Sequence, residues 1–169
     1  MEIIDLSCDT LDRAKERFFE TLEMMTVEEA NHMPSPIVKS VHWLVWHSAK
    51  IMDEQIAALK GSQPIYDQED LHQAFGIDLP RDTKDWYHTP EEAKKVIITN
   101  RELLVDYYIK SNQQAKDYLK SISGQELDEI VDRSWNPPVS RGVRIVSTID
   151  DIVMHSGQAV YTRRLVIGK

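Results

Sequence analysis

The sequence predicts an all-α protein, an up-down four-helix bundle with a long crossover between its second and third helices and short extra helices. Apolar residues recur at intervals of three and four in four separate segments, which is the spacing of amphipathic helices. Capping residues stand at the ends of these segments, and no segment shows strand-like alternation of any length. A chain of 169 residues suits one compact domain, so we expect a single domain over residues 1–169.

The first two main helices are expected over residues 9–25 and 39–60. Asp9 is the predicted cap of the first, and the buried stripe that follows is Leu11, Ala14, Phe18, Leu22 and Met25. A capping box at Thr26 opens a short helix before Pro34. The second main helix should stop at Gly61, with a buried side formed by Val41, Leu44, Ser48, Met52, Gln55 and Leu59.

Residues 61–88 form the predicted crossover, which glycines, prolines and scattered aromatic residues interrupt. A connection this long is often a lid or a binding loop, and we expect it to border the opening of a metal cleft. The alternative is a packed crossover with short helical turns. His72 and His88 belong to no spacing pattern and are interpreted as surface histidines.

The third and fourth main helices are expected over residues 90–121 and 141–166. Thr89, Pro90 and Glu92 together form a helix start, and the apolar stripe after them predicts one helix of about 30 residues. A short helix should run from Ser123 to about Asp132. The last helix has a buried stripe of Ile145, Ile149, Ile152, Ser156 and Val160.

The composition limits which binding partners and which cellular compartment are expected for this protein. The net charge of −8 and the pI of about 5.2 disfavour binding to nucleic acid, whose phosphates are negative. No apolar run approaches the ~20 residues that cross a bilayer, and residues 1–5 lack the basic start and apolar core of a signal peptide. Cys8 is the single cysteine, which excludes an internal disulfide. We therefore expect a cytoplasmic protein that binds neither nucleic acid nor membrane.

Three side chains are candidate metal ligands. Asp151 and His155 are four residues apart, so they share one face of the last helix. His47 lies at the margin of the buried side of the second helix, flanked by Trp43 and Trp46. Helices packed ~8–10 Å apart can bring such margins within reach of one ion. The alternative is that His47 is an ordinary boundary histidine.

These segments resemble the DinB/YfiT-like superfamily of proposed metalloenzymes over nearly the whole chain. The resemblance is carried by SVHWLVWH at residues 40–47 and HSGQAVYTR at residues 155–163. It implies metal binding by His47 and His155, with Asp151 where the family usually has a middle histidine. Two histidines and a carboxylate suit Zn²⁺, Ni²⁺, Fe²⁺ or Mn²⁺ and leave positions open. The alternative is a branch that has lost its metal, in which Asp151 only accepts a hydrogen bond.

The resemblance implies a thiol-dependent S-transferase or isomerase that uses a low-molecular-weight thiol and acts on a small electrophile. Arg144 or Arg163 would then hold carboxylates of the thiol, and Gln158, Trp43 and Trp86 are further candidates for substrate binding. The alternatives are a metal-dependent hydrolase of a small substrate and a non-enzymatic, stress-associated helical bundle that binds a ligand or a partner. Self-association as a homodimer is left open.

Overall fold

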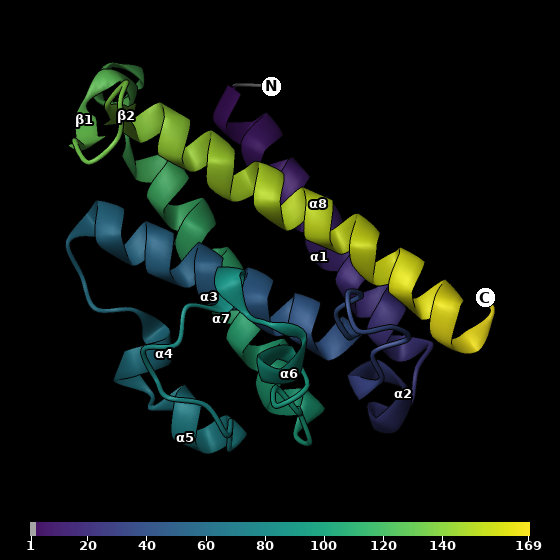
Figure 1. Cartoon of the computed structure of the whole chain (residues 1–169). Helices are drawn as coiled ribbons and strands as arrows, with labels where there is room; N and C mark the ends of the chain where they lie inside the picture. The colour runs from purple at the N-terminus through teal and green to yellow at the C-terminus, as the bar shows by residue number, and fades with distance from the viewer. Residues whose placement is uncertain (1–2) are drawn as a thin grey trace.

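Four long helices form the body of the molecule: α1 (Ile3–Glu23), α3 (Val41–Lys60), α7 (Arg101–Ser121) and α8 (Arg141–Ile167) (Figure 1). This computed structural model describes residues 3–169. The segment that was compared with a signal peptide, residues 1–5, begins outside the described residues. Helices α1 and α3 each pack against both α7 and α8. The predicted all-α bundle is confirmed.

The direction of each helix follows from its contacts. Along α3 and α7, Asp53 meets Tyr107 and Lys60 meets Gln114, so these two consecutive main helices are parallel and do not alternate in direction as the expected up-down order would have it. Helix α8 runs antiparallel to α3, because Arg141 near its start reaches the carbonyl of Leu59 and His155, further along, lies beside His47. The long crossover makes the parallel pair possible, since it returns the chain to the end of the bundle where α3 begins (Figure 1).

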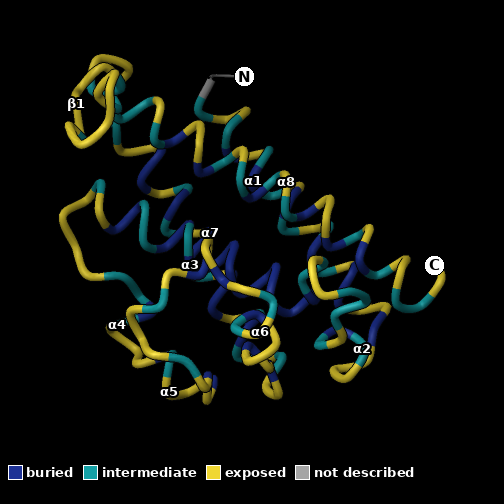
Figure 2. Tube along the Cα trace, viewed as in Figure 1, coloured by how far each residue is buried: buried dark blue, intermediate teal, exposed yellow. Residues whose placement is uncertain are grey.

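Helix α3 is the centre of the core, with every residue from Val41 to Lys50 buried (Figure 2). Its first turn is capped by Ser40, whose side chain accepts a hydrogen bond from the backbone N–H of Trp43. Gly61 ends it in the left-handed conformation, at a φ of 67°, which glycine adopts without a steric penalty. A helix surrounded by three others and a crossover has little exposed surface, which explains its apolar composition.

Helix α1 begins earlier than expected. It starts at Ile3, and Asp9 is not its cap but lies within it, paired with Arg13 one turn on. The predicted apolar stripe is buried, from Leu11 at 2% exposed to Met25 at 4%. The short α2 (Val27–Asn31) follows with the predicted capping box at Thr26.

The expectation of one helix over residues 90–121 is wrong. Helix α6 (Pro90–Ala93) keeps the predicted capping box of Thr89 and Glu92, but α7 begins only at Arg101. Between them burial alternates, with Val96 and Ile98 buried and Ile97 exposed, as it does along an extended chain.

Contacts distant in sequence hold this segment extended. The Asn31 side chain donates to the carbonyl of Ile98 and accepts from its N–H, at 2.8 and 2.9 Å. Asn100 then caps α7 by accepting from the N–H of Leu103. Arg101 donates to the carbonyl oxygens of Leu22 and Met25 at the end of α1. The contacts of Asn31 and Asn100 satisfy backbone groups of Ile98 and Leu103 that a continuous helix would have paired internally.

The crossover contains three short helical turns: α4 (Ile65–Gln68), α5 (Leu71–Phe75) and the 3₁₀ turn η1 (Asp85–Tyr87). Asp53 on α3 fixes its start. This carboxylate is 0% exposed and accepts hydrogen bonds from the N–H groups of Ile65 and Tyr66, from the Tyr107 hydroxyl and from the Gln114 amide. The crossover is thus packed against the bundle.

Before α8, the chain forms a 3₁₀ turn, η2 (Gly124–Asp128), and an antiparallel pair of strands, β1 (Ile130–Asp132) and β2 (Val139–Ser140). The predicted short helix therefore ends before Asp132, and its last residues are strand. Strands of three and two residues are too short to show an alternating pattern in sequence. Between residues 3 and 169 no helix is both long and apolar enough to cross a membrane.

Candidate metal centre

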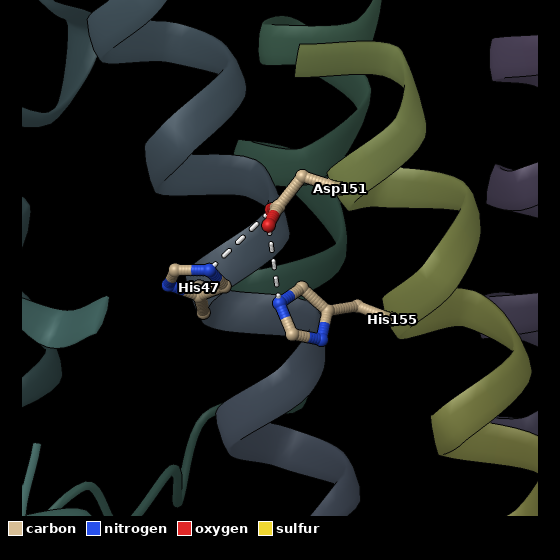
Figure 3. Close-up of side chains that lie close together, drawn as sticks. All are labelled: His47, Asp151 and His155. Carbon is tan, nitrogen blue, oxygen red and sulfur yellow. Dashed lines mark ion pairs between the residues drawn. The ribbon is translucent and has the colours of Figure 1, made fainter. Parts of the chain in front are cut away.

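His47 of α3 and Asp151 and His155 of α8 point toward one another (Figure 3). Their candidate ligand atoms all lie within 4.8 Å of one another. The two oxygens of Asp151 each lie 3.5 Å from the Nε2 atom of one histidine, and the two imidazole rings are nearly perpendicular. One spacing on α8 and one position on α3 predict this convergence from the sequence.

The three side chains differ in exposure. That of His47 is 3% exposed, that of His155 12% and that of Asp151 31%. His47 is therefore buried instead of lying at the margin expected from its helix alone, because the crossover covers it. The cluster has a closed side at α3 and a side open to solvent at α8, so a ligand would approach past Asp151.

A buried carboxylate from the crossover holds the far side of His47. Asp85 Oδ2 lies 2.7 Å from His47 Nδ1. Burial alone would lower the pKa of His47, but Asp151 and Asp85 flank the ring and raise it to about 9. Burial would likewise raise the pKa of Asp85, yet its hydrogen bond with His47 and the charges of His47 and Lys50 lower it. Without metal, His47 is thus a cation between two carboxylates.

The surroundings of the Asp151 carboxylate show whether this site fits a metal ion. Its Oδ2 atom is buried and has no hydrogen-bond partner in the described part of the chain, since 3.5 Å is too long for a good hydrogen bond. Ligand atoms in a tetrahedral site with bonds of 2.0–2.2 Å stand roughly 3.4 Å apart. Each oxygen of Asp151 is therefore spaced from one imidazole nitrogen as two co-ligands are, and a divalent cation would satisfy the oxygen that lacks a hydrogen bond.

Gln158 and Trp43 orient His155 and line the site. Gln158 Oε1 lies 2.7 Å from His155 Nδ1, so Nδ1–H donates to the amide oxygen and Nε2 is left to face Asp151. The indole of Trp43 stacks on His47, with 4.7 Å between ring centroids, and meets His155 edge-on. Aromatic packing on both rings restricts their rotation.

The interpretation of His88 as a surface histidine is wrong. Its side chain is buried at 8% exposed, and its Nδ1 accepts a hydrogen bond of 3.0 Å from the indole N–H of Trp43. Its ring also stacks on Trp46. His72 is half-buried, and its two ring nitrogens lie near the Tyr66 hydroxyl and the Leu79 carbonyl oxygen.

The arginines proposed for substrate binding lie away from the cluster. Arg144 is seven residues before Asp151, roughly 10 Å along the helix, and it binds Asp132 and Gln55. Arg163 is eight residues after His155, roughly 12 Å away, and donates to the carbonyl of Lys169.

Trp86 is 50% exposed and packs against Tyr87. The substrate roles of Trp86 and the two arginines stay predictions, as do those of Trp43 and Gln158, which do contact the cluster.

The crossover borders the cluster through Asp85 and His88, but it does so on the closed side at α3 and not at the opening, where it was expected. Neither residue is among the predicted site residues. Both residues follow the irregular stretch after Pro80, where no helical period assigns a face to a side chain. Their partners lie about 40 residues earlier in the chain, with separations of 38 and 45. The sequence signal that could have pointed to them is a carboxylate and an imidazole in a long loop rich in aromatic residues, and this signal is weak.

Comparisons with known proteins bear on the family and the fold. A family model described as the DinB superfamily matches residues 10–159. Among solved structures, the chain is similar to a conserved protein from Enterococcus faecalis known from a crystal structure, with 55% sequence identity and a TM-score of 0.96. The match covers 100% of this chain and 99% of that one. A search of curated proteins found no match.

Proposed function

Because the chain belongs to the DinB superfamily, we propose that it is a metal-dependent transferase that joins a low-molecular-weight thiol to a small electrophile. His47, Asp151 and His155 would hold the metal, and the chemistry of these ligands suits Zn²⁺, Ni²⁺, Fe²⁺ or Mn²⁺. The observation that supports this best is the Asp151 carboxylate between two imidazoles, whose buried Oδ2 atom faces His47 and has no hydrogen-bond partner among the described residues. A bound metal would supply Lewis acidity that lowers the pKa of a thiol.

The chain's own groups favour a nucleophile that comes from a small molecule. Its one thiol, Cys8, is buried on α1, and burial raises its pKa, which makes it a poor nucleophile. Around the cluster, the aromatic ring of Trp43 covers His47 and limits the access of water from that side. The more exposed Asp151 leaves the opposite side free for a substrate.

Metal content tests the first half of the proposal. Purified protein, stripped with a chelator and reloaded with each candidate metal, should retain about one equivalent by elemental analysis. His155→Ala should retain almost none, because it removes one of three ligands. His32→Ala, which changes an exposed histidine at the end of α2, should retain as much as the wild type.

Thiol consumption tests the second half. The loaded protein is incubated with a chromogenic electrophile and a panel of small thiols, and the expected result is metal-dependent loss of thiol that His155→Ala abolishes. Metal retention with hydrolysis of ester or amide substrates, and no thiol consumption, would favour the hydrolase instead. Failure to retain any metal after reloading would favour a non-enzymatic bundle.

A further inference from the structure

We propose that Asp85 is a positioning residue of this metal centre, an inference that rests on the proposed function. Asp85 is 1% exposed and comes from the crossover, outside both helices that carry the ligands. Its Oδ2 atom accepts the Nδ1–H of His47 at 2.7 Å. This bond fixes the ring so that Nε2, the atom 3.5 Å from Asp151, is the one available to a metal.

The charges around Asp85 favour a cation bound to Nε2 of His47, on the side of the ring that faces away from Asp85. Lys50 lies 3.8 Å from Asp85 Oδ1, but it is paired more closely with Glu54, at 2.5 Å. Asp85 Oδ1 itself has no hydrogen-bond partner in the part of the chain that the structure describes. Asp85 and Asp151 place one carboxylate beside each ring nitrogen of His47. A divalent cation on neutral imidazoles would balance the two carboxylates.

The same bond attaches the crossover to the centre. Asp85 begins η1, and His88, directly after that turn, accepts the indole N–H of Trp43. Lys39 also donates to the carbonyl of His88 at 3.0 Å. Residues 85–88 are thus held on α3 next to His47, and an ion that fixes the His47 ring should also reduce local opening of this segment.

The test compares Asp85→Asn with Asp82→Asn. Asp82 is an exposed carboxylate three residues earlier on the crossover, so the two variants lose the same formal charge. Zn²⁺ affinity is measured by competition with a chromophoric chelator. We expect Asp85→Asn to bind Zn²⁺ about 10- to 100-fold more weakly and Asp82→Asn to stay within about twofold of wild type. Equal affinity in the wild type and Asp85→Asn would overturn the inference while leaving the proposed function intact.

Two measurements on the wild type separate positioning from mere stability. In Zn²⁺-loaded protein, ¹⁵N NMR should show the proton of His47 on Nδ1 and the metal on Nε2; the opposite tautomer would overturn the inference whatever the variants do. Hydrogen exchange of residues 83–88 should slow when Zn²⁺ binds, and less so in Asp85→Asn. Wild-type protein that binds no Zn²⁺ at all would overturn both this inference and the proposed metal centre.

Discussion

At His47, one imidazole lies between two carboxylates, and this sets how metal binding should respond to pH. Asp151 and Asp85 raise the pKa of His47 to about 9 despite its burial. A metal must displace the proton from Nε2, so the proton competes with it at every pH below that value. For an ordinary histidine the proton would compete with the metal only at pH values below about 6.5. The raised pKa of His47 extends this competition to higher pH.

The expected outcome is a Zn²⁺ affinity that increases by about tenfold per pH unit between pH 7 and 9 and then levels off. Chelator competition at a series of pH values measures it, and calorimetry in buffers of different ionisation enthalpy counts the proton released. Asp150→Asn, an exposed neighbour on α8, should leave the profile unchanged. A plateau reached already near pH 7 would show that the two carboxylates do not raise the pKa of His47.

At the scale of elements, Asp53 joins α3, α4 and α7 through one buried carboxylate. Four donors converge on it, at distances of 2.9–3.0 Å. It fixes where the crossover leaves the bundle, while Asp85 and His88 fix where it returns to α3. The crossover is therefore held at both ends by polar contacts with α3.

Asp53→Ala should destabilise the fold by about 3–5 kcal/mol, because it leaves buried donors without an acceptor. Urea unfolding followed by circular dichroism measures the change. The control is Asp106→Ala, a carboxylate on α7 that is 54% exposed and pairs with Lys110; it should change stability by no more than about 0.5 kcal/mol. A loss below about 1 kcal/mol in Asp53→Ala would mean that water replaces the carboxylate.

The elements also show how far sequence patterns reach. Helix faces follow from local periodicity, so the four stripes and the approach of His47 to Asp151 and His155 could be predicted. The break at residues 94–100 could not, because it depends on Asn31 pairing with Ile98 from 67 residues away. Ala93, Val96 and Ile97 continue a helical period well enough to hide it, although the β-branched residues Val96 and Ile97 are weak helix formers.

Across the whole molecule, the centre connects two main helices that are distant in sequence. His47 lies on α3, whereas Asp151 and His155 lie on α8. The two helices pack closely along their lengths, so an ion held between them would act as a cross-link in the native state alone. The unfolded chain does not hold these ligands together, so metal binding should stabilise the fold.

At free Zn²⁺ about 100 times its dissociation constant, the stabilisation should be about 2.7 kcal/mol. For a chain of this size that raises the melting temperature by about 5–11 °C. His47→Ala should abolish the shift because it removes the ligand contributed by α3, even if the variant melts lower without metal. His72→Ala should keep the full shift, since its ring bonds within the crossover. Differential scanning calorimetry with and without Zn²⁺ measures the shift in each protein. An equal shift in His47→Ala would place the stabilising ion at some other site, independent of α3.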